Sequence, residues 1–291
     1  MTGINEAGPA LLLLCCDLDR TVIPNGAAEE SPMARPLFRE LAARPEVVLA
    51  YVSGRHIDLI DNAIREYGLP VPDFAVGDVG TTIYRRSDDD WRPVTEWAAE
   101  IGGDWGTFRH ADILGHLAQI DGVVLQPPDR QNTYKLSFFV DLEHEIAPLL
   151  TLVRDRLDSL GIRYCLIWSV DEASGQGLLD LLPASATKLH AVEFLIRRLA
   201  VDENGVVFAG DSGNDLPVLC SGHQAVLVRN AAYEVREVAM QALRESNRPI
   251  DRLYIAQGGF MEMNGNYCSG ILEGVCHFIP AVRDWLDGVS T

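Results

Sequence analysis

The sequence is poor in positive charge. It holds 24 Lys and Arg residues against 42 Asp and Glu residues, so its formal net charge is 24 − 42 = −18. A surface this acidic repels nucleic acid and anionic lipid, which argues against nucleic acid or a membrane as a partner. It would equally repel a free phosphate ester, so any site for such an ester must gather its own cations.

The sequence also lacks the cysteine and histidine patterns of a structural zinc site. Its six cysteines form no C-x-x-C pair, and no histidines stand at zinc-ligand spacing. Most of the cysteines lie in apolar runs such as LLLLCC and GVCHF, which is typical of buried, reduced thiols. We therefore expect a reducing compartment, the cytoplasm.

No apolar run is long enough to cross a membrane. The run from Ala10 to Cys16 follows Glu6 rather than a basic residue and precedes further acidic residues, which indicates a buried strand and not a signal peptide. Internal repeats and low-complexity tracts are missing as well. With 291 residues, 47% of them hydrophobic, we expect roughly two globular domains or one domain with a large insertion.

What the sequence does contain is an alternation of short apolar runs and amphipathic helical patterns at both ends of the chain. This alternation predicts an α/β fold, a Rossmann-like doubly wound parallel sheet with helices on both faces. The expected strands are 11–16, 47–52, 206–209, 225–228 and 253–256, and the expected helices are about 33–43, 56–67, 188–199, 231–245 and 269–279.

The middle of the chain has a different pattern. It predicts an α+β cap at 88–183, inserted into a core formed by 1–87 and 184–291. Within the cap we expect strands at 134–140, 163–168 and 178–182 and a helix at about 145–159. The acidic run Asp88 to Asp90 is interpreted as a solvated hinge. The three nearby tryptophans are expected to be core residues rather than a ligand platform: Trp91, Trp97 and Trp105.

Four polar clusters fall at one expected edge of the sheet, outside the carboxyl ends of its strands, where open parallel sheets bind ligands. Each alone could be a helix cap, a glycine turn or a solvated lysine, but four at one edge indicate a site. They are DLDRT at 17–21, SGR at 53–55, Lys188 and GDSGND at 210–215.

The carboxylates of Asp17, Asp19 and Asp211 would repel one another at such an edge, so a hard divalent cation is implied. Oxygen ligands shared with a phosphate suit Mg²⁺. The repulsion between an anionic nucleophile and a phosphate is roughly 4 kcal/mol per unit-charge pair at 4 Å. Mg²⁺ and Lys188 would offset it.

The expected roles follow from this arrangement. Asp17 would attack phosphorus and form an acyl phosphate, while Asp19 would first donate a proton to the leaving oxygen and then activate water. Ser53 and the backbone N–H groups of 18–20 and Gly54 would bind the phosphate oxygens, and Arg55 completes this candidate phosphate site. Two further residues would orient Lys188 and the metal waters: Asn214 and Asp215.

The order of the four motifs resembles that of the haloacid dehalogenase superfamily of phosphatases, and more closely that of sucrose-6-phosphate phosphatases and their relatives. The resemblance extends in order through VLAYVSGR, VPDFAVGDVGTTIY, YKLSFFVD, LLDLLPASATKLHAVEFL, FAGDSGND, VLVRNAAYE and SGILEGVCHF. It implies Mg²⁺ held by Asp17, the Asp19 carbonyl and Asp211, with Asp215 beside them. It also implies that Lys135 and Asp180 of the cap contact the sugar.

The chain departs from that family pattern in four places. Arg20 replaces the usual small or amide residue, Ser53 stands where threonine is common, the segment 169–177 is longer, and 257–266 is an added loop. The changes in the cap leave the substrate open. Sucrose 6-phosphate is the first candidate substrate, and mannosylfructose phosphate is the first alternative. A sugar-phosphate synthase is a candidate partner.

Other classes of protein share parts of this pattern. A receiver-type signalling domain also gathers acids, a Ser or Thr and a Lys, but it is only roughly 120 residues long and has no cap. A catalytically silent partner of a synthase should lack one of the four charged site residues, and all are present: Asp17, Asp19, Lys188 and Asp211. A nucleotidase or phosphoserine phosphatase would share the core, so only substrate tests separate these enzymes.

Overall fold

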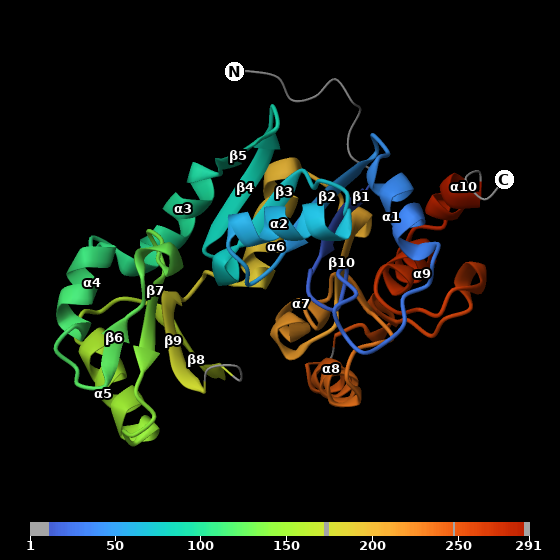
Figure 1. Ribbon diagram of the computed structural model, residues 1–291. Coiled ribbons are helices and arrows are strands. Elements are labelled where there is room, and N and C mark those ends of the chain that lie inside the picture. The colour runs from blue at the N-terminus through green and yellow to red at the C-terminus, as the bar shows by residue number, and fades with distance from the viewer. Residues whose placement is uncertain (1–11, 172–174, 247, 288–291) are drawn as a thin grey trace. The chain divides into compact units, whose positions relative to one another are not determined.

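The computed structural model describes residues 12–171, 175–246 and 248–287 (Figure 1). The chain divides into two compact units, which we call the core unit (1–93 with 188–291) and the cap unit (94–187). Among the helices in the described ranges, none has both the length and the apolar character needed to cross a membrane.

An eight-stranded sheet forms the centre of the core unit, in the order β12-β11-β10-β1-β2-β3-β4-β5. The strands from β12 to β3 run parallel, and β4 and β5 continue the sheet as an antiparallel hairpin. Their bounds are β1 Leu12–Cys16, β2 Val47–Val52, β3 Phe74–Gly77, β4 Thr82–Ser87, β5 Asp90–Pro93, β10 Val206–Gly210, β11 Gln224–Leu227 and β12 Leu253–Ile255.

The helices of the core unit follow the apolar periodicity of the sequence. In α2, for example, Ile60, Ala63 and Ile64 are buried, and the helix ends at Gly68, which adopts the left-handed conformation with φ 58°. The helix bounds are α1 Ala34–Ala42, α2 Ile57–Tyr67, α6 Lys188–Leu199, α7 Leu216–Leu219, α8 Tyr233–Glu245, α9 Cys268–Phe278 and α10 Ala281–Asp287.

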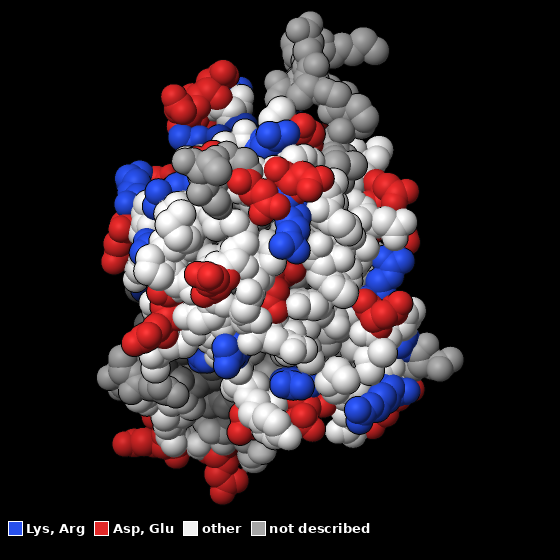
Figure 2. Space-filling view, turned by 90° about the vertical axis from the view of Figure 1, so that its right-hand side faces the viewer, with Lys and Arg blue, Asp and Glu red and all other residues white. Residues whose placement is uncertain are grey.

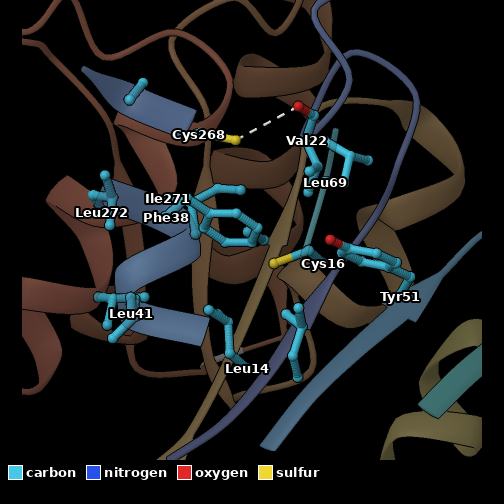
Figure 3. Close-up of a cluster of buried hydrophobic side chains, with 14 of the residues drawn as sticks. Leu14, Cys16, Val22, Phe38, Leu41, Tyr51, Leu69, Cys268, Ile271 and Leu272 are labelled. Carbon is cyan, nitrogen blue, oxygen red and sulfur yellow. Dashed lines mark hydrogen bonds between the residues drawn. The ribbon is translucent and has the colours of Figure 1, made fainter. Parts of the chain in front are cut away.

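Side chains of α1 and α9 pack against one face of β1, as Figure 3 shows. Leu14 and Cys16 lie two positions apart on β1 and face the cluster that contains Phe38 of α1 and Ile271 of α9. Burying each large apolar side chain of this kind contributes about 2 kcal/mol. The packing holds β1, and with it the loop that starts at residue 17, in a fixed position.

The cap unit is an antiparallel sheet in the order β6-β7-β9-β8 with helices on one face. Its core includes Trp105, which is fully buried, and Trp97 in α3 is fully buried as well, so the prediction that these two are core residues is confirmed. The bounds are α3 Thr95–Gly102, α4 His110–Leu117, α5 Ile146–Asp158, β6 Val123–Leu125, β7 Leu136–Val140, β8 Tyr164–Asp171 and β9 Gln176–Pro183.

The interpretation of the run Asp88 to Asp90 as a hinge is wrong. This run forms the turn of the β4–β5 hairpin in the core sheet, where Ser87 pairs with Asp90. Asp88 and Asp89 adopt positive φ angles of 49° and 63°, as a tight turn requires. Trp91 therefore lies in the core unit rather than the cap, and the second compact unit spans residues 94–187 where 88–183 was expected.

Candidate active site

Three polar clusters lie where parallel strands of the core sheet end. Asp17 directly follows β1, Ser53 directly follows β2 and Asp211 directly follows β10. The strand ends are in register, since the Asp17 N–H donates to the carbonyl of Ala209 at 2.9 Å. Because β1 lies between β2 and β10, the structure brings these three clusters to one edge of the sheet.

Lys188, the first residue of α6, supplies positive charge at this edge. Its ammonium group donates to Asp17 Oδ1 at 2.7 Å, to Asp215 Oδ1 at 2.8 Å and to Asn214 Oδ1 at 3.0 Å. Burial alone would lower the pKa of Lys188, but Asp17 and Asp215 raise it above its ordinary value. The side chain is therefore a buried, charged ammonium group held by three acceptors.

The charge at this edge contrasts with the outer surface. Figure 2 shows one face of the molecule, where Asp and Glu side chains are scattered and Lys and Arg lie between them. On the described part of this face the two signs are interspersed. Lys188 is only 8% exposed, so its charge acts inside the site.

Asp17, Asp211 and Asp215 form a cluster that suits a cation. One oxygen atom from each lies within 4.8 Å of the others. Burial, the largest cause in both cases, raises the pKa of Asp17 to about 7 and the pKa of Asp211 to about 6. Asp211 Oδ2 is buried and accepts no hydrogen bond from the described residues. A hard divalent ion with oxygen ligands fits this donor set.

Asp215 also shapes the loop that carries Asp211. Its Oδ2 accepts hydrogen bonds from the backbone N–H groups of Asp211 and Ser212, each at 3.1 Å. A Cβ at Gly210 would lie 2.6 Å from the Asp215 carboxyl carbon, so glycine is required there. Asp215 therefore orients Lys188 and the loop, and its direct bond to a metal ion stays a prediction.

Asp19 pairs with an arginine rather than with the acidic cluster. Arg55 donates from Nε to Asp19 Oδ2 at 2.8 Å and from Nη2 to Oδ1, and Asn25 Nδ2 donates to Oδ1 at 2.7 Å. This bidentate pair connects the loop after β1 with the loop after β2. The Asp19 side chain is 42% exposed, so a ligand can reach it. The role of its backbone carbonyl as a metal ligand stays a prediction.

Ser53 and Gly54 leave room for a ligand at the end of β2. Ser53 is buried, and its Oγ accepts the N–H of Arg55 at 3.2 Å. A Cβ at Gly54 would meet no atom within 4 Å, so open space adjoins the backbone here. The N-cap of α2 is His56, which frees Ser53 from a capping role. Phosphate binding by these residues stays a prediction.

The sequence analysis assigned no role to three polar residues that the structure places at the site. Thr21 Oγ1 donates to Asp211 Oδ1 at 3.3 Å. Arg20 Nε lies 3.3 Å from Asp211 Oδ2, and Asn230 Nδ2 donates to the Arg20 carbonyl at 2.6 Å. Arg20 stood out in the sequence as a departure from the family pattern, and Asn230 lies in the quoted stretch VLVRNAAYE.

The two predicted sugar-binding residues both belong to the cap unit. Asp180 of β9 pairs with Ser137 of β7, whose Oγ donates to Asp180 Oδ1 at 2.5 Å. Lys135 stands two residues before Ser137 and thus on the same face of the strand. Leu136 and Leu181 alternate with them and point into the cap core. Lys135 and Asp180 accordingly share the sheet face that is turned away from that core.

Comparison with known proteins places this chain in a family. Residues 10–279 match the family described as sucrose-6F-phosphate phosphohydrolase. A haloacid dehalogenase-like hydrolase of Nitrosococcus oceani is 51% identical over 276 residues, which cover 95% of this chain and 74% of that protein. The mannosylfructose-phosphate phosphatase of Agrobacterium fabrum is 28% identical over 269 residues, 92% of this chain and 97% of that protein.

A solved structure is similar over the same extent. The sucrose-phosphatase of Synechocystis, in complex with sucrose and phosphate, matches with a TM-score of 0.67 and 27% identity. The match covers 92% of this chain and 98% of that one. Fold and site together define a phosphatase of the haloacid dehalogenase superfamily. Within it, the chain belongs to the sucrose-6F-phosphate phosphohydrolase family, which confirms the predicted family, fold class and enzyme class.

Proposed function

We propose that the protein hydrolyses a small sugar phosphate in a Mg²⁺-dependent reaction, through a phospho-aspartate formed on Asp17. The contact between Lys188 Nζ and Asp17 Oδ1, at 2.7 Å, carries this proposal. It sets a buried cation beside a carboxylate in an acidic cluster that suits a second, divalent cation. An anionic nucleophile could then approach a phosphate dianion without prohibitive repulsion.

The proposed first step transfers the phosphoryl group to the protein. A carboxylate oxygen of Asp17 bonds to phosphorus while the bond from phosphorus to the sugar oxygen breaks, and Asp19 gives that oxygen a proton. Mg²⁺, when bound by Asp17, the Asp19 carbonyl and Asp211, would neutralise phosphate charge. Lys188 steadies the same charge. Asp19 must turn from Arg55 toward the phosphate, which its exposure allows.

The second step restores the nucleophile. Asp19 takes a proton from a water molecule, whose oxygen attacks the phosphorus bound to Asp17. Inorganic phosphate leaves and the Asp17 carboxylate is free again. Ser53, Gly54 and Arg55 lie at the end of β2 beside this position and would bind the phosphate oxygens in both steps.

Sucrose 6-phosphate is the proposed substrate, with mannosylfructose phosphate as the alternative. The first is favoured by the match to the sucrose-6F-phosphate phosphohydrolase family over residues 10–279. The second is favoured by the relative from Agrobacterium fabrum, which matches over 97% of its own length. We propose that the cap unit selects the sugar and that Lys135 and Asp180 contact it.

The test is phosphate release from a panel of sugar phosphates with and without Mg²⁺. Sucrose 6-phosphate should lead the panel, followed by mannosylfructose phosphate, and Asp17→Asn should be inactive. Release that needs no metal, or an active Asp17→Asn variant, would defeat the mechanism. Equal rates on all sugar phosphates would remove the substrate assignment alone.

We also propose a cytoplasmic location and a synthase as partner. The six cysteines are free, and four of them are buried, as expected for a reducing compartment. An enzyme that makes the sugar phosphate is the natural source of substrate for this site. Co-elution of the two purified proteins in gel filtration would support the partnership, and separate elution at micromolar concentration would contradict it.

A further inference from the structure

The backbone of Arg20 adopts a conformation that does not favour arginine. Its φ is 60°, in the left-handed region that glycine and asparagine tolerate best. Both of its backbone groups are fixed, because its N–H donates to Asn25 Oδ1 at 2.8 Å and its carbonyl accepts from Asn230 at 2.6 Å. The surrounding structure therefore imposes this backbone strain. An arginine at such a position is explained if its side chain has a function.

The side chain of Arg20 contacts the acidic cluster from its solvent side. Its Nε lies 3.3 Å from Asp211 Oδ2, the buried oxygen that accepts no hydrogen bond from the described residues. The Asp211 side chain is 2% exposed, whereas that of Arg20 is 49% exposed. The guanidinium group can thus move away into solvent.

We infer that Arg20 is a built-in competitor of the metal ion. It neutralises Asp211 when no cation is bound and withdraws when Mg²⁺ binds, and so it sets the metal affinity of this chain. The inference rests on the proposed function in one respect, the assignment of Asp211 as a metal ligand. A positive charge that uses the same oxygen and repels the incoming dication must weaken Mg²⁺ binding. Arg20 acts through Asp211 and is a positioning residue.

Three substitutions separate the charge of Arg20 from its backbone strain. Arg20→Gln removes the charge and keeps the strain, Arg20→Asn removes both, and Arg20→Lys keeps both. Titration calorimetry with MgCl₂ on the substrate-free protein measures the affinity directly. We expect Arg20→Gln and Arg20→Asn to tighten Mg²⁺ binding about tenfold. The effect is limited because solvent screens the charge of a half-exposed group. The Arg20→Lys variant should bind Mg²⁺ with the affinity of the unmodified protein.

Arg92→Gln is the matched control, because it changes the net charge equally at an exposed position of the core sheet, where the side chain is 65% exposed. Its Mg²⁺ affinity should equal that of the unmodified protein. If only Arg20→Asn binds Mg²⁺ more tightly, backbone strain and not charge controls the affinity, and the inference is overturned. Equal affinity in all variants would also overturn it. Failure of the unmodified protein to bind Mg²⁺ would overturn the metal assignment of the proposed function as well.

Discussion

At the scale of single residues, Lys188 is the cation on which the buried carboxylates depend. Lys188→Met would leave Asp17 and Asp215 without their shared donor, and breaking a buried pair costs about 3 kcal/mol. The loss of charge at the phosphate should lower kcat by about 1,000-fold. Steady-state kinetics and thermal unfolding of the metal-free protein measure the two effects.

Lys135, the other lysine of the chain, provides the comparison. Lys135→Met should raise KM and leave kcat within about threefold, because the proposed contact is with the sugar and not with the transferring group. The melting temperature should hardly change, since Lys135 is only partly buried. A fall in kcat as large as that of Lys188→Met would contradict this division of roles.

Asp17→Asn should act on stability in the opposite direction from Lys188→Met. Three carboxylates lie together here, and they face only two cations, Lys188 and the half-exposed Arg20, so negative charge is in excess. Burial raises the pKa of Asp17 from 3.8 to about 7, so the folded state binds its proton more tightly than the unfolded state does. The free energy of unfolding of the metal-free protein must therefore fall as pH rises from about 4 to about 7.

In Asp17→Asn this part of the pH dependence should disappear. At pH 8 in EDTA we expect the variant to exceed the unmodified protein in unfolding free energy by on the order of 1 kcal/mol, and at pH 4 the gain should vanish. Urea unfolding at both pH values measures it. The same gain at pH 4 and pH 8 would show that charge is not its cause.

Residue types and their order predicted which side chains meet at this edge of the sheet, but not the contacts between them. The apolar run before Asp17 and the glycine turn around Asp211 allowed the sequence to predict that both residues follow a strand. The pairing of Asp19 with Arg55 joins two loops that are 36 residues apart, and no local pattern encodes it. The left-handed φ of Arg20 likewise depends on Asn25 and the loop after β11, which hold its backbone.

At the scale of elements, α9 fixes the loop 257–266 through one buried carboxylate. Glu273 accepts hydrogen bonds from the N–H groups of Gln257 and Gly258, both at 2.9 Å, and from the Tyr254 hydroxyl at 2.8 Å. Glu273→Gln would remove the charge from three donors and should destabilise the protein by about 2 kcal/mol. Thermal unfolding and hydrogen exchange of the loop measure the effect.

The control for that change is Glu237→Gln on α8, where the side chain is exposed. Its unfolding free energy should stay within about 0.5 kcal/mol of the unmodified protein. Hydrogen exchange at 257–266 should rise in Glu273→Gln only. Equal exchange in both variants would mean that the loop holds its conformation without the carboxylate.

Elements of the core sheet differed in how well the sequence predicted them. Strands β1, β2 and β10 are continuous apolar runs because helices cover both of their faces, and such runs are easy to recognise. The hairpin β4–β5 reads TIYRRS and DWRP and was missed, since its exposed arginines and proline do not alternate with apolar residues. Strand β3, of four residues, was not predicted either.

At the scale of the whole molecule, Mg²⁺ should raise the melting temperature. A ligand that binds only the folded state at 100 times its Kd stabilises by about 2.7 kcal/mol, which for a chain of this size is a shift of roughly 5–10 °C. Scanning fluorimetry in EDTA and in MgCl₂ measures the shift. Asp211→Asn should abolish it, and an equal shift in that variant would place the ion elsewhere.

The position of the cap unit in the sequence has a consequence for synthesis. Leu13 of β1 pairs with Val206 of β10, so a growing chain must complete residues 94–187 before one side of β1 finds its neighbour. Until then the apolar strand presents an unpaired edge that invites association with other chains. The cap strands β7, β8 and β9 are close in sequence and can pair early. Newly made protein should therefore need chaperone protection until β10 has left the ribosome.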